Sequence, residues 1–391
     1  MNKQASKLQA TAVLGALAAC MQPAQAVDIK AGDWTVAVGG NVNAYYTFVD
    51  CSGGQVGGLA LGGEALGCGG RDSRTTIGNG LLPSGLVTSA TSQLGGYDVK
   101  ALIGIYAHTA TDSAISQNSG VDVRQAFFSF GNAGLGTVKL GRDYGIFGAN
   151  AILNDMTLMG VGAPVQATQR GRVALGHIGA GYAYLNHYGQ IAYTTPDLGS
   201  GLSVDLGLMS PVDDTPVVAP SAYTAGSTPQ FQAQLTYKQG DNIKAWLGAK
   251  AQRFDPLGPG TPDLTMRAVE AGVLYTSGPA GLLLNFQSGR GLGILSDADQ
   301  GRVRTRHVLV QGTYKVSDQV KVGLSYGHSK NSEDAAGTGG LKSNANVTLG
   351  AYYALNSAIT LVAEAGQTRS KAFAGPRDKM NGIALGGIIF F

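Results

Sequence analysis

Hydrophobic and polar residues alternate with a period of two along most of the chain. In residues 230–237, Phe231, Ala233 and Leu235 occupy every second position, and glutamine or threonine occupies the positions between them. The same alternation recurs in residues 202–209, 319–328 and 344–354. Since successive side chains of a β-strand point to opposite faces, each segment is predicted to be a strand with one apolar and one polar face.

The connections between these segments alternate in length. Short turns alternate with long polar stretches. The long stretches are residues 51–71, 109–120, 210–228, 254–265, 290–301, 330–343 and 368–379. About sixteen strands of the length usual for membrane barrels fit between Trp34 and Phe391. The second of them, around residues 75–82, is interrupted by glycine and followed by Pro83.

Two architectures could use such strands. In a soluble sandwich the apolar faces pack together and carry large side chains, whereas here they mix Ala, Val, Leu and Gly. The polar faces carry Gln, Asn, Lys and Asp. This distribution favours an all-β fold, a transmembrane antiparallel β-barrel of about sixteen strands with lipid outside and water inside. One such barrel accounts for residues 27–391.

The composition removes two other classes of protein. Glycine supplies 60 of the 391 residues and charged residues only 14%, too few for a chain kept disordered by its charge. The formal net charge is +3, and Lys3 and Lys7 lie in an N-terminal leader, so the rest of the chain is close to neutral. Nucleic-acid binding through bulk positive charge is therefore excluded.

Residues 1–26 are predicted to be a signal peptide for export through the Sec pathway. An apolar stretch at residues 8–19 follows the two lysines and precedes the small-x-small cleavage site Ala24-Gln25-Ala26, which places the mature start at Val27. The apolar stretch is too short to span a bilayer as a helix. In the alternative interpretation the segment is a lipoprotein signal, and Cys20 would be acylated.

Two cysteines, Cys51 and Cys68, follow the leader, both in one glycine-rich segment. An even count in an exported chain favours a disulfide between them. The alternatives are two free thiols or a metal site, but no histidine or second cysteine pair flanks them. We therefore expect no metal and no cofactor.

Several segments together resemble the trimeric general porins of β-proteobacterial outer membranes. They are residues 124–128 and 136–142, the hairpin at residues 188–196, the pair Tyr45-Tyr46 in the first strand, and the terminal Phe391. The resemblance spans residues 27–391. It implies an outer-membrane location, a homotrimer, and recognition of the final aromatic residue by the barrel-assembly machinery.

The resemblance also implies that the third long loop, from Asp143 to about residue 183, folds inward and narrows the pore. Its charged residues are Asp143, Asp155, Arg170 and Arg172, with Arg142 at its entry. Opposed acids and bases across a water-filled constriction set a transverse field that favours polar solutes. Alternatively, Arg170 and Arg172 anchor the loop to the wall. Reversing their charge would shift ion selectivity only in the first case.

Strand alternation places further charges on the lumenal face. The bases are Lys139, Lys244, Lys250 and Lys321, and the acids are Asp205, Glu270 and Glu364. This small basic excess favours a weakly anion-leaning general diffusion channel for small hydrophilic solutes and ions. A solute-specific channel is the alternative, although it would call for a denser basic ladder or an aromatic track.

A basic cluster lies near the outer end of one predicted strand. It comprises Arg290, Arg302, Arg304 and Arg306. Facing outward, these side chains could bind lipopolysaccharide phosphates, because guanidinium groups match phosphate geometry. A solvated loop face is the other interpretation.

The sequence contains no enzymatic motif in its usual structural context. The histidines are scattered and lack metal-ligand spacing: His108, His177, His187, His307 and His328. The pattern G-x-S-x-G occurs once, at residues 323–327, but inside a predicted strand and not at the strand-to-helix turn of a nucleophile elbow. No phosphate-binding glycine loop occurs. We therefore expect no enzyme, with a barrel hydrolase whose Ser-His pair comes from distant strands as the alternative. A purely structural barrel would be plugged by large inward side chains, whereas the predicted inward set is small or polar.

Overall fold

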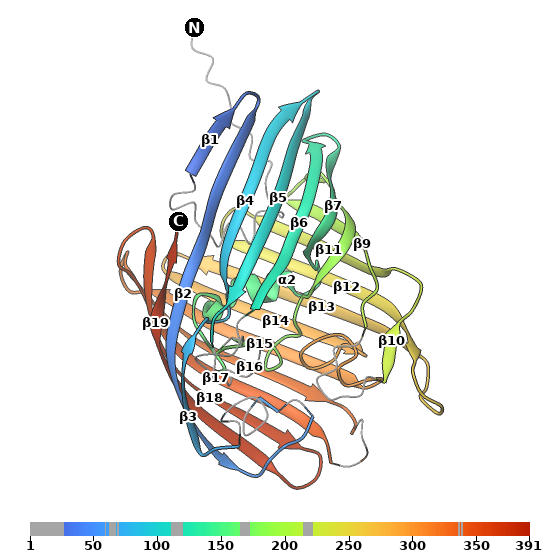
Figure 1. Cartoon of the computed structure of the whole chain (residues 1–391), viewed down its shortest axis with the longest axis vertical. Coiled ribbons are helices and arrows are strands. Elements are labelled where there is room, and N and C mark those ends of the chain that lie inside the picture. The colour runs from blue at the N-terminus through green and yellow to red at the C-terminus, as the bar shows by residue number, and fades with distance from the viewer. Residues whose placement is uncertain are drawn as a thin grey trace.

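In the computed structural model, sixteen antiparallel strands form a closed barrel, as the sequence predicts. The described residues are 27–58, 60–61, 68, 70–110, 120–164, 173–213, 222–334, 337 and 339–391. Each strand pairs with the next along the chain, and β19 (Arg377–Phe390) pairs with β2 (Trp34–Gly53) to close the ring (Figure 1). The predicted signal peptide, residues 1–26, lies outside the described residues. No helix in the described part is long and apolar enough to cross a membrane.

The strands between these two follow one another around the ring. They are β5 (Tyr97–His108), β6 (Gly120–Asn132), β7 (Gly136–Tyr144), β8 (His187–Thr194), β9 (Leu202–Met209), β11 (Gln230–Gln239), β12 (Ile243–Pro256), β13 (Leu264–Ser277), β14 (Ala280–Arg290), β15 (Arg304–Lys315), β16 (Val320–Asn331), β17 (Leu341–Ala354) and β18 (Ile359–Ala372). Turns of a few residues join the strands at one end, which we call the short-turn end. The longest connections lie at the opposite, long-loop end. The long stretch predicted at residues 368–379 is wrong, because β18 and β19 extend through most of it and leave only residues 373–376 as a turn.

The second strand of the barrel is divided into β3 (Ser73–Gly78) and β4 (Ser84–Leu94), which pair with successive parts of β2. Pro83 in the gap has no N–H to give to the sheet. Asn43 of β2 covers the break, because its Nδ2 donates to Leu82 O at 3.0 Å and its Oδ1 accepts from Gly80 N at 2.9 Å. The strand predicted at residues 75–82 therefore covers only the break and the end of β3.

Two short strands lie outside the ring of sixteen. β1 (Val27–Ala31) forms a hairpin with the start of β2, beyond the last residue of β19, so regular structure begins earlier than the predicted start at Trp34. β10 (Tyr223–Ala225) pairs with the outer end of β12. Neither strand takes part in closing the barrel.

Strand alternation separates a lipid face from a lumenal face. In β17, Val347 and Leu349 are exposed on the outside, whereas Asn346 and Thr348 are buried inside. The final strand breaks this rule at its end, where Ile388 and Phe390 are buried on the inner side. Phe391, the predicted assembly signal, is exposed.

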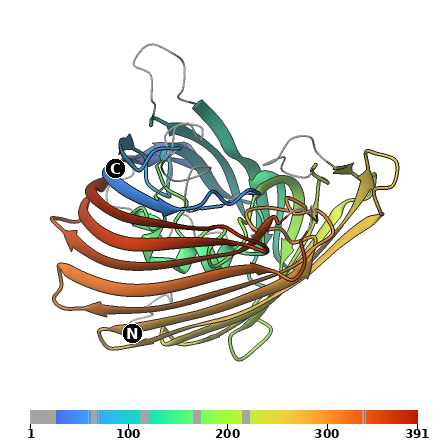
Figure 2. The ribbon, with the colours of Figure 1, turned by 90° about the horizontal axis from the view of Figure 1, so that it is seen from below.

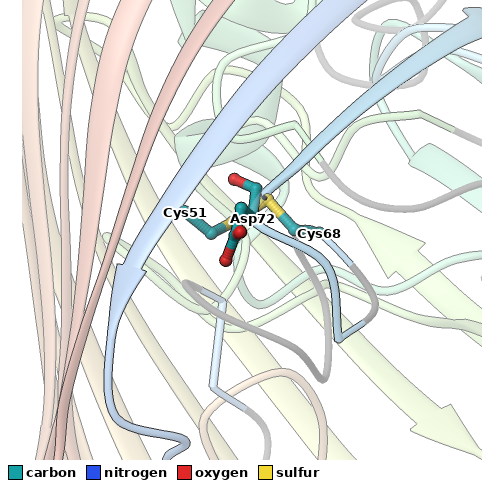
Figure 3. The surroundings of a disulfide bond; sticks show 3 residues. All are labelled: Cys51, Cys68 and Asp72. Carbon is teal, nitrogen blue, oxygen red and sulfur yellow. Dashed lines mark hydrogen bonds between the residues drawn. A yellow bond between two sulfur atoms is a disulfide. The ribbon is translucent and has the colours of Figure 1, made fainter.

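The described parts of the third loop, residues 145–164 and 173–186, lie inside the ring and carry the helix α2 (Ala149–Asn154) and the single turn η1 (Met156–Met159) (Figures 1 and 2). The family resemblance implies this inward fold. Nearer the rim, a disulfide joins Cys51 to Cys68, and Cys51 N donates to Asp72 O at 2.7 Å (Figure 3). The first loop is thereby tied to the end of β2.

Candidate functional site

In its described residues the third loop forms only isolated β-bridges within itself, and side chains of the barrel wall supply further hydrogen-bond acceptors. Gln232 Oε1 on β11 accepts hydrogen bonds from Ile146 N at 2.8 Å and Phe147 N at 2.9 Å. Glu270 Oε2 on β13 accepts from Gly148 N at 2.9 Å. A buried N–H without a partner costs about 1–3 kcal/mol, so these wall acceptors fix the start of the loop.

Further contacts hold the middle of the loop. Gln311 on β15 accepts from Met156 N at 2.6 Å and donates to Asn154 O at 2.9 Å. Glu364 Oε2 on β18 accepts from Val161 N and Gly162 N, each at 2.8 Å. Wall residues therefore hold the loop both before α2 and after it along the chain.

The returning part of the loop is held in the same manner. Ala183 N donates to Gln287 Oε1 on β14 at 2.9 Å, and Gly181 N donates to Ser329 Oγ on β16 at 3.0 Å. The loop also approaches the wall very closely, since a Cβ at Gly327 would lie 1.8 Å from Ala180 O. Only glycine fits there, so the sequence of the wall is adapted to the loop.

Glu270 and Glu364 point inward, as strand alternation predicts, but both are buried. Their carboxylates accept hydrogen bonds from loop backbone, and Glu364 Oε1 also accepts from Tyr352 OH at 2.7 Å. They anchor the loop. The expectation that they line open water is therefore corrected.

Asp155 holds the loop together from within. It accepts hydrogen bonds from Tyr182 OH at 2.7 Å and Thr157 N at 2.9 Å, and lies 3.1 Å from His177 Nδ1, with both side chains fully buried. Burial alone would raise the pKa of Asp155, but His177 and these hydrogen bonds outweigh it and hold the pKa below its usual value. The expected role of Asp155 as a charge facing the constriction is therefore wrong.

Arg142 and Asp143, at the start of the third loop, lie on opposite faces of β7. Asp143 is buried on the inner face of β7, where it pairs with Lys139 Nζ at 2.5 Å and accepts from Gln125 Nε2 at 2.9 Å. Arg142 lies on the opposite, exposed face and donates to Val123 O at 3.0 Å. Its expected place in the constriction is wrong, because adjacent strand residues face opposite ways. Arg170 and Arg172 lie outside the described residues.

The sixth loop, residues 291–303, also folds inward, which the sequence analysis missed. Lys250 on β12 forms a buried ion pair with Asp297 of this loop, and Asp297 also accepts from Tyr188 OH at 3.1 Å. Tyr184 N of the third loop donates to Leu295 O at 2.7 Å. Lys250 therefore fixes a loop, although alternation alone placed it among the pore-lining bases.

Parts of the first, third and sixth loops pack on one another, and we call them the loop assembly. Its apolar contact is made by Val56, Ala60, Leu61, Ala180 and Ile294, with Leu341 of the wall. Asp299 closes the sixth loop by accepting from the N–H groups of Ile294, Leu295 and Ser296. Burial raises the pKa of Asp299 to about 7, against the lowering effect of those three hydrogen bonds.

The sequence analysis also missed Arg124, which points inward from β6. A β-bulge opposite Gly104 and Ile105 turns Arg124 and Gln125 to the same side, so simple alternation fails there. Arg124 donates through Nε to Asp122 at 3.1 Å and lies 2.9 Å from His108 Nε2. The sequence offers no signal for this bulge.

Three half-buried lysines lie on the inner face near the short-turn end. They are Lys100 on β5, Lys244 on β12 and Lys321 on β16. Lys244 also lines a cavity of about 80 Å³ with Lys139, Asp143 and Asp205. Asp205 is buried and accepts from Thr194 Oγ1 at 2.6 Å. In the described part of the chain, no three His, Cys, Asp or Glu side chains gather as a metal site.

Comparisons with known proteins agree with this architecture. The chain matches the family model for the Gram-negative porin over residues 10–372. A search of curated proteins finds no match.

Three of the solved structures with the same fold are outer-membrane proteins. The outer membrane channel DcaP of Acinetobacter baumannii has a TM-score of 0.69 at 17% identity, covering 93% of this chain and 99% of that chain. The anion-selective porin from Comamonas acidovorans has a TM-score of 0.64 at 19% identity, covering 92% and 100%. OmpF of Salmonella typhi, in complex with daunomycin, has a TM-score of 0.61 at 16% identity, covering 93% and 100%.

Removing one wall anchor should loosen the third loop. In Glu364→Ala, Val161 N and Gly162 N lose their acceptor, so we expect a loss of stability of about 1–3 kcal/mol per unsatisfied group. Single-channel recordings in planar bilayers should show larger and noisier conductance than wild type. Glu364→Gln keeps an acceptor oxygen and is the matched control. Equal traces from the alanine and wild-type proteins would contradict the anchoring role.

The sixth loop should dock more weakly as pH rises. The pKa of docked Asp299, about 7, lies above its ordinary value of 3.8, so the docked loop holds the proton more tightly than the undocked loop. Docking is then strongest below pH 4 and weakens as pH rises through about 7. Hydrogen exchange in peptides from residues 291–303, corrected for the intrinsic rate, should be faster at pH 8 than at pH 5. Asp299→Asn should abolish that difference, and an equal pH response in both proteins would refute it.

Proposed function

The chain belongs to the Gram-negative porin family, and on that premise we propose that its channel is weakly anion-selective. The protein is an outer-membrane barrel that lets small hydrophilic solutes and ions diffuse through a water-filled lumen. What we add to this activity is the sign of the charge preference and the residues that set it.

The observation that supports this proposal is that inward-facing acids are more deeply buried than three of the inward-facing lysines. Glu270, Glu364 and Asp297 are buried and hydrogen-bonded to loop backbone or paired with lysine. Lys100, Lys244 and Lys321 are only half-buried and lie toward the short-turn end. A half-exposed cation acts on passing ions more than a fully buried carboxylate does, so we expect the lumen at the short-turn end to attract anions.

One solved structure with this fold is named an anion-selective porin, that of Comamonas acidovorans. The likeness is one of fold, and the lysines of this chain carry the argument independently. The modest number of half-buried bases supports general diffusion of anions. A solute-specific channel would call for a closer series of ligands along the pore.

A second candidate function rests on one specific arrangement. His177 lies between Asp155, 3.1 Å from Nδ1, and Ser325, 3.1 Å from Nε2, in the order of a Ser-His-Asp triad. The His177 side chain is fully buried and Ser325 is 1% exposed. A nucleophile must reach a substrate carbonyl, and this one faces packed loop and wall. We therefore propose that the three residues fasten the third loop to β16 and that the protein is not an enzyme.

Assembly and lipid contacts form the remaining part of the proposal. We propose a homotrimer, as the family resemblance implies, in contact with lipopolysaccharide at the long-loop end. The exposed terminal Phe391 serves as the signal for the barrel-assembly machinery. Its backbone is paired with Gly40 at 2.8 and 3.1 Å, which leaves the ring on the surface.

The charge preference should follow the three lysines. Replacing Lys100, Lys244 and Lys321 together with glutamine should move the reversal potential in a salt gradient toward cations. The shift should be larger at low salt, since charges are screened over about 10 Å at 0.1 M. The triple variant Arg369→Gln, Lys371→Gln and Lys379→Gln removes the same charge from the outer face of β18 and β19 and is the control. Equal shifts in both variants would contradict the proposal.

The buried serine should be chemically inert. A serine-directed fluorophosphonate reagent is expected to leave Ser325 of the folded protein unlabelled, as read by mass spectrometry of the peptide that contains it. The urea-denatured and refolded protein, treated identically, controls for trapping of the reagent. Stoichiometric labelling of the native protein, lost in His177→Gln, would instead establish the hydrolase.

A further inference from the structure

Three arginines stand side by side on the outer face of the barrel. Arg267 of β13 is directly opposite Arg290 of β14, which is directly opposite Arg304 of β15. All three side chains are exposed. We call them the arginine row. It lies at the long-loop end of these strands, which in outer-membrane barrels faces the outside of the cell.

The row is electrostatically unfavourable by itself. Like charges directly opposite one another on a sheet destabilise the pair. Among the described residues, none of the three forms a salt bridge, and the nearby Asp255 is engaged by Arg253 at 3.3 Å. Arg306 is directly opposite Lys330 on the neighbouring strand, so the positive charge continues onto β16. An anionic partner from outside the chain would relieve this repulsion.

An apolar groove lies on the same strands, nearer the middle of the barrel. Its volume is about 550 Å³, and its exposed lining includes Leu247, Leu284, Phe286 and Val310. Ala271 lies between Leu247 and Phe286 in the sheet, and its small side chain leaves the space that forms the groove. Arg267 precedes Ala271 by four residues on β13 and Arg290 follows Phe286 by four residues on β14, so both lie about 13 Å closer to the long-loop end.

From this juxtaposition we propose that the arginine row and the groove together form a binding site for lipopolysaccharide of the outer leaflet. The phosphates of its lipid anchor accept charge-assisted hydrogen bonds from the guanidinium groups. An acyl chain occupies the groove below. The proposal rests on the outer-membrane location of the channel, and it assigns a partner surface that is separate from the pore.

The choice of occupant follows from the order of the two features along the membrane normal. A lipid anchor carries phosphate at the interface and hydrocarbon beneath it, and the surface presents arginine and then apolar side chains in that order. Inorganic phosphate would leave the groove empty. A second copy of this chain would bring its own arginine row, which supplies no anion.

The test compares two triple variants of the intact protein, purified in detergent. One is Arg267→Gln, Arg290→Gln and Arg304→Gln, and the matched control is Arg369→Gln, Lys371→Gln and Arg377→Gln on β18 and β19. Native mass spectrometry with added lipopolysaccharide should show binding weakened roughly tenfold or more in the first variant, as expected for losing charge-assisted hydrogen bonds. The control should stay within about threefold of wild type. Equal weakening in both would overturn the site in favour of a diffuse basic rim.

Two further measurements address the groove and the phosphate. Ala271→Trp fills the groove and should weaken binding while the arginines remain. Lipopolysaccharide stripped of its phosphates should bind wild type and the arginine variant equally weakly. The site is refuted if inorganic phosphate alone displaces the lipid completely. It is also refuted if Ala271→Trp breaks the oligomer and leaves lipid binding intact, since the groove would then be a subunit interface.

The same proteins separate this site from the channel. Conductance of the arginine variant in planar bilayers should match wild type, because the row faces away from the lumen. A wild-type protein that bound lipopolysaccharide but conducted no ions would sink the channel function and leave the lipid site standing.

Discussion

The interior of this barrel depends on one requirement, that a long backbone segment inside the ring must find hydrogen-bond partners. The third loop has no sheet to join, and the wall supplies acceptors in place of one. Gln232, Glu270, Gln311 and Glu364 each accept from loop N–H groups. The inward face of the strands therefore has two tasks, since it must hold the loop and also leave a wet path for solutes. The inward-facing charges reflect both tasks, because Glu270 and Glu364 are buried as acceptors for the loop, whereas Lys100, Lys244 and Lys321 are only half-buried.

Strand alternation carries most of the fold from sequence to structure. It predicts the barrel and puts Lys139, Lys250, Glu270 and Glu364 on the inner face, where the structure has them. It says nothing of what such a side chain touches once inside, so Glu270 and Glu364 looked like pore-lining charges. Alternation also fails wherever the period is broken. Arg124 turns inward because a bulge adds one residue to β6, and nothing local in the sequence marks that position.

The contacts made by the loops could not be predicted, for a different reason. Asp155 belongs to a segment without periodicity, and its partners His177 and Tyr182 are far along the chain. The sixth loop has the glycine and aspartate composition of a solvated connection, yet Asp297 and Asp299 serve its burial. The place of Arg142 at the loop entry predicts a position in the pore, whereas the alternation of β7 puts it on the outside. Where the two guides conflict, the periodicity of the strand is the better one.

The attachment of the third loop has a mechanical consequence. Its start is bonded to β11 and β13, its middle to β15 and β18, and Tyr45 OH of β2 donates to Met159 O at 2.5 Å. These strands lie far apart around the circumference, so the loop spans the ring as a brace. A wide cylinder flattens easily under lateral pressure from the surrounding bilayer, and a brace across its interior resists that ovalisation. The segment that folds into the lumen thus also helps to keep the cross-section of the barrel open.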